Sequence, residues 1–330
     1  MERSKRLIIA LLLLFLILCP LAIEGLPPAV LFDQFQTFST IFLGIFIEAV
    51  PFLLAGTLAS GLIEVFVSRE RVLRLVPRNP LVAALMGSIL GFVFPVCECG
   101  VVPVTRRLFR KGLALPVGAA YLVAAPVVNP IVIASTWTAY GFGKVLLMRV
   151  GLTLAIAVTI GYVFALASDP SRVLRPEPIT FPLCNVDPHP PQRWFRRLPA
   201  ALVVAGDEFF EMGRYLVFGS LLAATLQTLT PQAALLGIGH GPVTSVLAMM
   251  SLAFVLSVCS TVDAFVSLAF TSTFTSGSIL AFLVFGPMVD LKSLLMFLGV
   301  FRRRAVAYLV LLPLAMTLFA ALFLNLNVGW

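Results

Sequence analysis

Charged residues are scarce in this chain. Only 12% of its 330 residues are Asp, Glu, Lys or Arg, whereas 60% belong to the apolar set. Soluble domains carry about 25% charged and roughly 45–50% apolar residues, so the composition argues against a water-soluble enzyme. A charged low-complexity tail is also missing, which argues against a disordered chain. The long apolar runs instead predict an all-α polytopic membrane protein, because a helix needs about 20 apolar residues to cross a bilayer.

Motifs for nucleotide and zinc binding are missing as well. No G-x-x-x-x-G-K-[ST] loop occurs, so we expect the chain not to hydrolyse ATP by itself. The cysteines form no C-x-x-C pair, which argues against a zinc ribbon. The five cysteines are Cys19, Cys97, Cys99, Cys184 and Cys259. We predict neither an enzyme nor a protein with a cofactor or a resident metal.

The net charge of +8 would suggest a nucleic-acid partner in a soluble chain. Here the basic residues occur in short clusters between apolar runs, which is the pattern of cytoplasmic loops. We therefore expect the lipid bilayer, and not nucleic acid, to be the partner. All but four of the 23 Lys and Arg residues lie in residues 1–6, 68–79, 105–111, 169–206 and 302–304.

The order of apolar and polar segments predicts four regions. Residues 1–35 hold an uncleaved N-terminal transmembrane helix, Leu7–Ile23, and an outer loop. Residues 36–168 form a first membrane repeat and residues 207–330 a second. Between them, residues 169–206 are rich in proline and arginine, which predicts an extended cytoplasmic linker.

Three pairs of segments suggest that the membrane region is duplicated. Residues 48–56 match residues 211–219, and each segment begins with Glu and ends with Gly. Pro95-Val-Cys matches Ser257-Val-Cys, and Pro126-Val-Val-Asn matches Pro287-Met-Val-Asp. The three matches occur in the same order at offsets of 161 to 163 residues, as expected for the internal repeats of many transporters.

The basic clusters also constrain the topology. If every apolar segment crosses the membrane, nine basic residues fall on the outer side. If residues 80–111 and 242–275 are re-entrant hairpins, the clusters are all cytoplasmic, the N-terminus included, and only Lys144 and Arg149 are misplaced. We favour the hairpins, which give each repeat three crossings and make the repeats inverted; the all-crossing arrangement is the alternative. Non-helical backbone at membrane depth must be buried in protein or line a water-filled cavity, so we expect a central cavity.

The segment Pro95-Val-Cys-Glu-Cys-Gly100 is the sharpest candidate site. Proline and glycine are expected to break a helix here and to free backbone groups. Cys97 and Cys99 alone could be small buried apolar residues. Glu98 favours a functional role, because an ionisable side chain at membrane depth usually faces a cavity.

The second half supplies an equivalent segment that contains Cys259 and Asp263. In an inverted repeat the two breaks converge near the membrane midplane. We expect Cys259 and Asp263 to join Cys97, Glu98 and Cys99 in one substrate site. Thiolates favour soft, thiophilic species such as trivalent arsenic or Cu(I).

Two further breaks are marked by prolines. Asn129 and Asp290 follow them and are candidate substrate ligands; the alternative is that they cap the broken helices. Asp290 is ionisable and is also a candidate for proton coupling. The prolines with a structural role at these breaks are Pro126, Pro130 and Pro287.

Glu48 and Glu211 correspond between the repeats and are candidate proton carriers. Glu211 shares a helix face with Glu208 and Arg214, so these three side chains could neutralise one another. Glu48 has no cation near it in sequence and is the stronger candidate. Arg214 and Lys292 are expected within helices near the cytoplasmic face.

Four motifs together resemble the predicted permeases of the ArsP/YraQ type. They are Ile47–Gly56, Pro95–Gly100, Lys111-Gly112 with Pro126–Pro130, and Phe285–Lys292, and the resemblance spans about residues 36–325. The best-known branch of that family exports trivalent organoarsenicals from bacteria, and many members have no assigned substrate. The resemblance implies a permease, with the cysteine motif of the family at Cys97, Cys99 and Cys259.

Two functions follow. The first is a secondary efflux transporter in the cell membrane for a thiophilic solute such as a trivalent organoarsenical. The second is a transmembrane thiol–disulfide electron carrier that uses Cys97 and Cys259 through mixed disulfides. Against the second, Glu98 and Asp263 would have no role in it. Expected partners are the solute and, for either function, a small thiol-redox or metalloid-binding protein.

Overall fold

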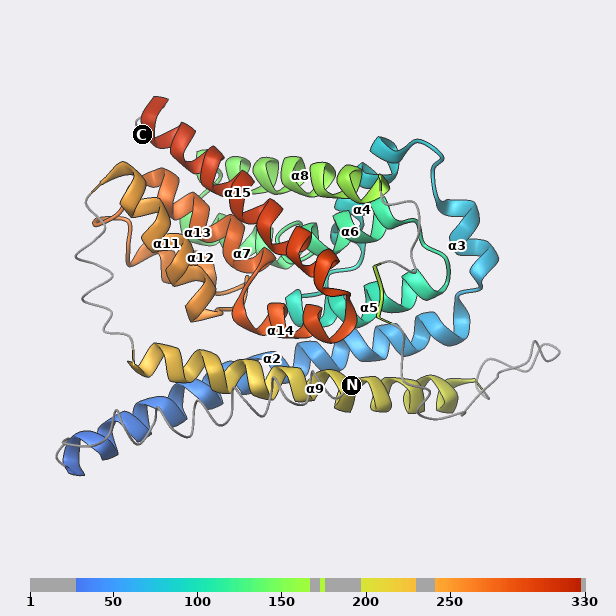
Figure 1. The fold of residues 1–330 in the computed structure, drawn as a ribbon, viewed down its shortest axis with the longest axis horizontal. Helices are drawn as coiled ribbons and strands as arrows, with labels where there is room; N and C mark the ends of the chain where they lie inside the picture. The colour runs from blue at the N-terminus through green and yellow to red at the C-terminus, as the bar shows by residue number, and fades with distance from the viewer. Residues whose placement is uncertain (1–27, 167–172, 176–196, 230–240, 328–330) are drawn as a thin grey trace.

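The structure is a computed structural model, and it describes residues 28–166, 173–175, 197–229 and 241–327 (Figure 1). The expected helix Leu7–Ile23, most of the linker 169–206, Cys19 and Cys184 lie outside this part of the chain. The described residues are mostly helical and form no strand, with one isolated β-bridge between Leu174 and Phe301. The predicted all-α class is confirmed for this part.

The helices fall into two series, one before and one after the linker. The first series is α2 (Pro28–Phe66), α3 (Arg69–Leu75), α4 (Pro80–Val93), α5 (Glu98–Arg110), α6 (Leu115–Ala124), α7 (Pro130–Tyr140) and α8 (Lys144–Ala165). The second series is α9 (Leu198–Leu229), α11 (Pro242–Leu256), α12 (Asp263–Leu268), α13 (Ser276–Met288), α14 (Leu291–Val300) and α15 (Arg303–Asn327).

Within the described ranges, five helical segments are long and apolar enough to span a bilayer, as expected for a polytopic membrane protein. They are Phe32–Phe66, Lys144–Ala165, Leu198–Leu229, Ser276–Val300 and Arg303–Asn327. Helices α4, α6 and α11 are apolar but shorter.

The helices are arranged in layers (Figure 1). The long helices α2 and α9 lie side by side along one face, α5 packs on α2, and α14 packs on α9. Helices α8 and α15 run along the opposite face. Helices α4, α6 and α8 contact one another, as do α11, α13 and α15, so the same set of contacts occurs in each half.

Local chemistry explains where the helices are interrupted. Asn129 accepts a hydrogen bond from the Ile131 amide (3.0 Å) and caps α7, in which Pro130 is the first residue. Asp290 accepts one from the Ser293 amide (2.6 Å) and caps α14. Pro126 lies in the break before α7.

Two predicted break residues lie elsewhere. The first break covers residues 94–97 and contains Pro95, whereas Gly100 lies inside α5, contrary to expectation. Gly56 of α2 and Gly100 together permit a close helix crossing, because a Cβ built on Gly56 would lie 2.4 Å from the Gly100 Cα and one built on Gly100 would lie 3.1 Å from the Gly56 Cα. Pro287 lies in the last turn of α13, one residue before that helix ends.

The segments that carry basic clusters meet at one end of the molecule, on the right in Figure 1. Lys111 Nζ, at the end of α5, donates hydrogen bonds to the Glu64 and Val67 carbonyls (2.6 and 2.7 Å), at the end of α2. The Arg302 amide donates to the Val173 carbonyl (2.8 Å) and so joins the linker to the α14–α15 turn. Helix α4 also starts toward this end in Figure 1, so segment 80–111 begins and ends on the same side of the molecule.

Candidate functional site

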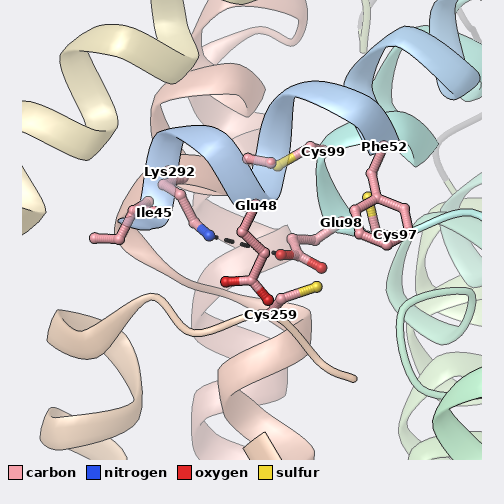
Figure 2. A pocket seen from close by; sticks show the side chains of 9 residues that line it. Ile45, Glu48, Phe52, Cys97, Glu98, Cys99, Cys259 and Lys292 are labelled. Carbon is pink, nitrogen blue, oxygen red and sulfur yellow. Dashed lines mark ion pairs between the residues drawn. The ribbon is translucent and has the colours of Figure 1, made fainter. Parts of the chain in front are cut away.

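A small pocket lies where the two helix breaks approach the middle of α2 (Figure 2). Its space, including its opening, amounts to about 190 Å³. Four parts of the fold contribute side chains: α2, the first break with the start of α5, the second break before α12, and α14. The lining residues are Ile45, Glu48, Ala49, Phe52, Cys97, Glu98, Cys99, Cys259 and Lys292.

The second break is held in place by hydrogen bonds to two other helices. Ser257 has a left-handed backbone (φ 48°), and its hydroxyl accepts from the Leu291 amide (3.2 Å) at the start of α14. Ser135 of α7 donates to the Thr261 carbonyl. Cys259 lies between these two anchors, and the break thereby presents its thiol to the pocket.

A buried charge cluster forms the floor of the pocket. Lys292 Nζ lies 3.7 Å from Glu98 Oε1 and 3.5 Å from Asp290 Oδ2. Glu98 and Lys292 are 4% and 2% exposed. Glu98 is also the first residue of α5, where the helix dipole favours a carboxylate.

Two carboxylate oxygens in this cluster lack hydrogen bonds. Within the described residues, Glu98 Oε2 and Asp290 Oδ2 are buried and have no hydrogen-bond partner. A buried carboxylate oxygen without a donor is costly. A proton could satisfy these oxygens in this conformation, whereas a water or a ligand would first need the pocket to widen, because its space does not hold a water-sized sphere.

Glu48 is a second carboxylate in the pocket lining. It is half-buried on α2, and Figure 2 shows its carboxylate beside Cys259. Its predicted counterpart Glu211 does not line the pocket. Instead, Glu211 Oε2 accepts a hydrogen bond from Arg106 Nη1 of α5 at 2.8 Å.

The three predicted thiols are brought to this one pocket. Cys97, Cys99 and Cys259 are buried and free. In the part of the chain that the structure describes, no group of three or more His, Cys, Asp or Glu side chains is arranged to hold a metal ion. The three thiols line the same pocket without forming a coordination site in this conformation.

Asp263 does not line the pocket. Its Oδ2 pairs with Arg149 Nη2 of α8 at 2.5 Å, and Arg149 Nη1 donates to Thr136 Oγ1 of α7 at 2.7 Å. Arg149 is only 1% exposed. This ion pair explains why Arg149 did not fit the distribution of basic loops: its charge is neutralised inside the protein.

Asn129 likewise lies outside the pocket lining, where it caps α7. Its counterpart Asp290 combines two contacts, because one oxygen caps α14 and the other faces Lys292. The capping interpretation therefore describes Asn129, whereas Asp290 is both a cap and part of the charge cluster.

The basic end of α5 binds acidic residues of its neighbours. Arg107 lies 3.8 Å from Glu208 of α9 and 3.6 Å from Glu64 of α2. Lys111 lies 3.7 Å from Glu64 as well, and burial lowers the pKa of its ammonium group while Glu64 opposes that shift. The cations that pair with Glu208 and Glu211 thus come from α5, whereas the sequence suggested Arg214 of their own helix.

Lys292 is the site residue that sequence reasoning missed. We expected it near the cytoplasmic face, and it lies in the pocket. The aligned repeats contained a signal: Lys292 follows Asp290 by two residues, and the equivalent position after Asn129 is the apolar Ile131. A cation that is present in only one repeat marks an asymmetric site.

Comparisons with known proteins show what the chain is similar to. A family model described as a predicted permease, ArsP_1, matches residues 34–326. The UPF0718 protein YcgR of Bacillus subtilis (strain 168) is 44% identical over 288 residues, which cover 86% of this chain and 96% of that protein. A Streptococcus mutans protein with the provisional name two-component membrane permease complex subunit is 36% identical over 271 residues, 82% of this chain and 89% of its own. No solved structure matches the chain.

Proposed function

The chain belongs to the ArsP_1 family of predicted permeases, and on that basis we propose that it is a secondary transporter that exports a thiophilic solute. A trivalent organoarsenical is the leading candidate. The solute would bind in the pocket between the two helix breaks, with Cys97, Cys99 and Cys259 as its ligands.

One observation carries this proposal: thiols from both halves of the chain line one buried pocket. Trivalent arsenic bonds to thiols, and soft metal ions prefer them to oxygen ligands. The thiols do not form a ready-made site here, so binding would require them to close around the solute. A solute that all three thiols contact only after closure would bind the closed conformation more tightly than the open one. It would therefore shift the conformational equilibrium toward the closed state.

The helix order supports inverted repeats as the scaffold for this transport. Helices α4, α6 and α8 correspond in order and contacts to α11, α13 and α15. Likewise, the α5–α14 contact has a counterpart in the α7–α12 contact. We assign repeat 1 to residues 36–168 and repeat 2 to residues 207–330, with segments 80–111 and 242–275 as hairpins that enter from opposite sides.

The basic clusters support an orientation in the cell membrane. The end of the molecule that gathers residues 67–79, 110–114, 173–175 and 301–304 would face the cytoplasm, together with the N-terminus. The name of the streptococcal relative suggests that this permease also works with a second protein component.

A toxicity panel in a host without its own exporters tests the function. We expect expression of the chain to raise resistance to a trivalent organoarsenical or a soft metal, and Cys97→Ser or Cys259→Ser to abolish this resistance. Serine preserves size and is a much weaker ligand for soft metals. The double variant Cys19→Ser/Cys184→Ser is the control and should retain resistance.

Full resistance in a variant that lacks Cys97, Cys99 and Cys259 would contradict the proposal. The alternative electron carrier predicts that Cys97 and Cys259 cycle between thiol and disulfide in membranes. Thiols that stay reduced whether or not a thioredoxin-type partner is present would exclude that carrier.

A further inference from the structure

The ammonium group of Lys292 is held loosely between two carboxylates. Its distances to Glu98 and Asp290, 3.7 and 3.5 Å, exceed the 2.7–3.2 Å typical of N–H···O hydrogen bonds. Its attraction to both groups is therefore electrostatic and does not depend on one fixed geometry. A lysine side chain in this position can move from one carboxylate toward the other.

The two carboxylates are not equivalent. Asp290 is already stabilised, because its Oδ1 accepts the Ser293 amide at the start of α14. Glu98 has one oxygen facing Lys292 and another, Oε2, that is buried without a hydrogen-bond partner among the described residues. Glu98 is thus the carboxylate with capacity for a further positive group.

The charges around the pocket favour a cation. Two carboxylates, those of Glu98 and Asp290, lie near the ammonium of Lys292, which is the one basic side chain in the described pocket lining. Glu48 adds a further carboxylate to that lining. An anion would meet this excess of negative charge in a buried site. A cation entering between Glu48 and Glu98 would be attracted by both.

We infer that Lys292 is a tethered cation, which pairs with Glu98 while the pocket is empty and gives up Glu98 to a cation that enters. The entering species is a metal cation that accepts both carboxylate and thiol ligands. This inference rests on the proposed function, because it treats the pocket as the transport site. The displaced ammonium keeps Asp290 as its partner.

The structure favours a movement of the side chain over a movement of the helix. A Cβ built on Gly219 of α9 would lie 2.9 Å from the Lys292 Cα, so α14 packs tightly on α9 at this residue. The backbone of Lys292 is held there, and the flexible four-carbon stem supplies the reach between Glu98 and Asp290.

The other buried ion pair provides a contrast. Arg149 lies 2.5 Å from Asp263 and also donates to Thr136, so its guanidinium is fixed by two hydrogen bonds. Arginine is suited to such fixed pairs, whereas lysine is a mobile point charge. Of these two ion pairs between the halves of the chain, Arg149–Asp263 is thus fixed and Lys292–Glu98 is exchangeable.

Binding of cadmium to the purified full chain, measured by calorimetry, tests the inference. Phenylarsine oxide, which is uncharged and thiophilic, is the comparison probe. Lys292→Met removes the competing charge and preserves side-chain length, so we expect cadmium to bind at least about tenfold more tightly, with little change for phenylarsine oxide. Arg71→Met, which removes an exposed basic residue of α3, is the matched control and should change neither affinity.

Glu98→Gln supplies a second test, which also serves if Lys292→Met does not fold. It should weaken cadmium binding at least about tenfold and leave phenylarsine oxide binding nearly unchanged. Unchanged or weaker cadmium binding by folded Lys292→Met, or unchanged cadmium binding by Glu98→Gln, would overturn the inference.

The two probes separate this inference from the proposed function. Cadmium binding that responds to Lys292 and Glu98, without any phenylarsine oxide binding, would support the tethered cation and count against the arsenical. Phenylarsine oxide binding that requires Cys97 and Cys259, with cadmium affinity independent of Lys292, would support the arsenical as a solute. It would overturn the tethered cation.

Discussion

Arg149 Nη2 lies 2.5 Å from Asp263 Oδ2, in an ion pair that connects α8 of the first half to α12 of the second. Both side chains are almost fully buried. Asp263 immediately follows the second break, as Glu98 follows the first, so each break is followed by a carboxylate that pairs with a cation from the other half of the chain.

Arg149→Met should destabilise the protein by about 3–5 kcal/mol, because it leaves the Asp263 carboxylate buried without its partner. Chemical unfolding in detergent measures this change. The double variant Arg149→Met/Asp263→Leu removes both charges and should recover most of the lost stability. A single variant as stable as the wild type would show that the pair is not formed in the membrane.

Glu48→Gln should impair transport more than Glu64→Gln does. Glu48 lines the pocket, whereas Glu64 lies at the end of α2 and pairs with Lys111 and Arg107. Resistance of the expressing host to the exported solute is the readout, with protein amounts in the membrane compared by immunoblot. Equal activity of the two variants would remove Glu48 from the mechanism.

Gly56→Ala should destabilise the protein by about 1–3 kcal/mol, because its new Cβ meets the backbone of Gly100 and forces α5 away from α2. Gly44→Ala, on the same helix, is the control, since nothing lies within 4 Å of a Cβ built there. Thermal unfolding in detergent compares the two. Equal melting temperatures would mean that α2 and α5 do not cross at Gly56.

Cysteine labelling should report the topology. Ser68→Cys and Arg110→Cys, both exposed at the basic end, should react with an impermeant maleimide only after the cells are opened, and Ser272→Cys should react from outside. Each of these cysteines is introduced into a variant from which the native cysteines have been removed. Labelling of Arg110→Cys from outside, with Ser68→Cys protected, would contradict the hairpin.

The composition and the spacing of apolar runs were enough to predict the all-α polytopic class. This works because a bilayer forces every backbone group to find its partner within a helix. The matched motifs of the two halves also predicted that Cys97, Cys99 and Cys259 come together, and these three residues line one pocket with Glu98. The repeated pattern carried this information, since related breaks are placed in related positions of the fold.

The partners of the charged side chains could be decided only by the tertiary structure. Asp263 was expected beside Cys259, but it points to Arg149, and Glu211 is paired with Arg106 from another helix. Sequence spacing gives the face of a helix on which a residue lies, but not the helix that this face meets. Lys292 and Glu98 are 194 residues apart in the sequence, and they lie close together because α14 packs on α5. This packing depends on close contacts throughout the core.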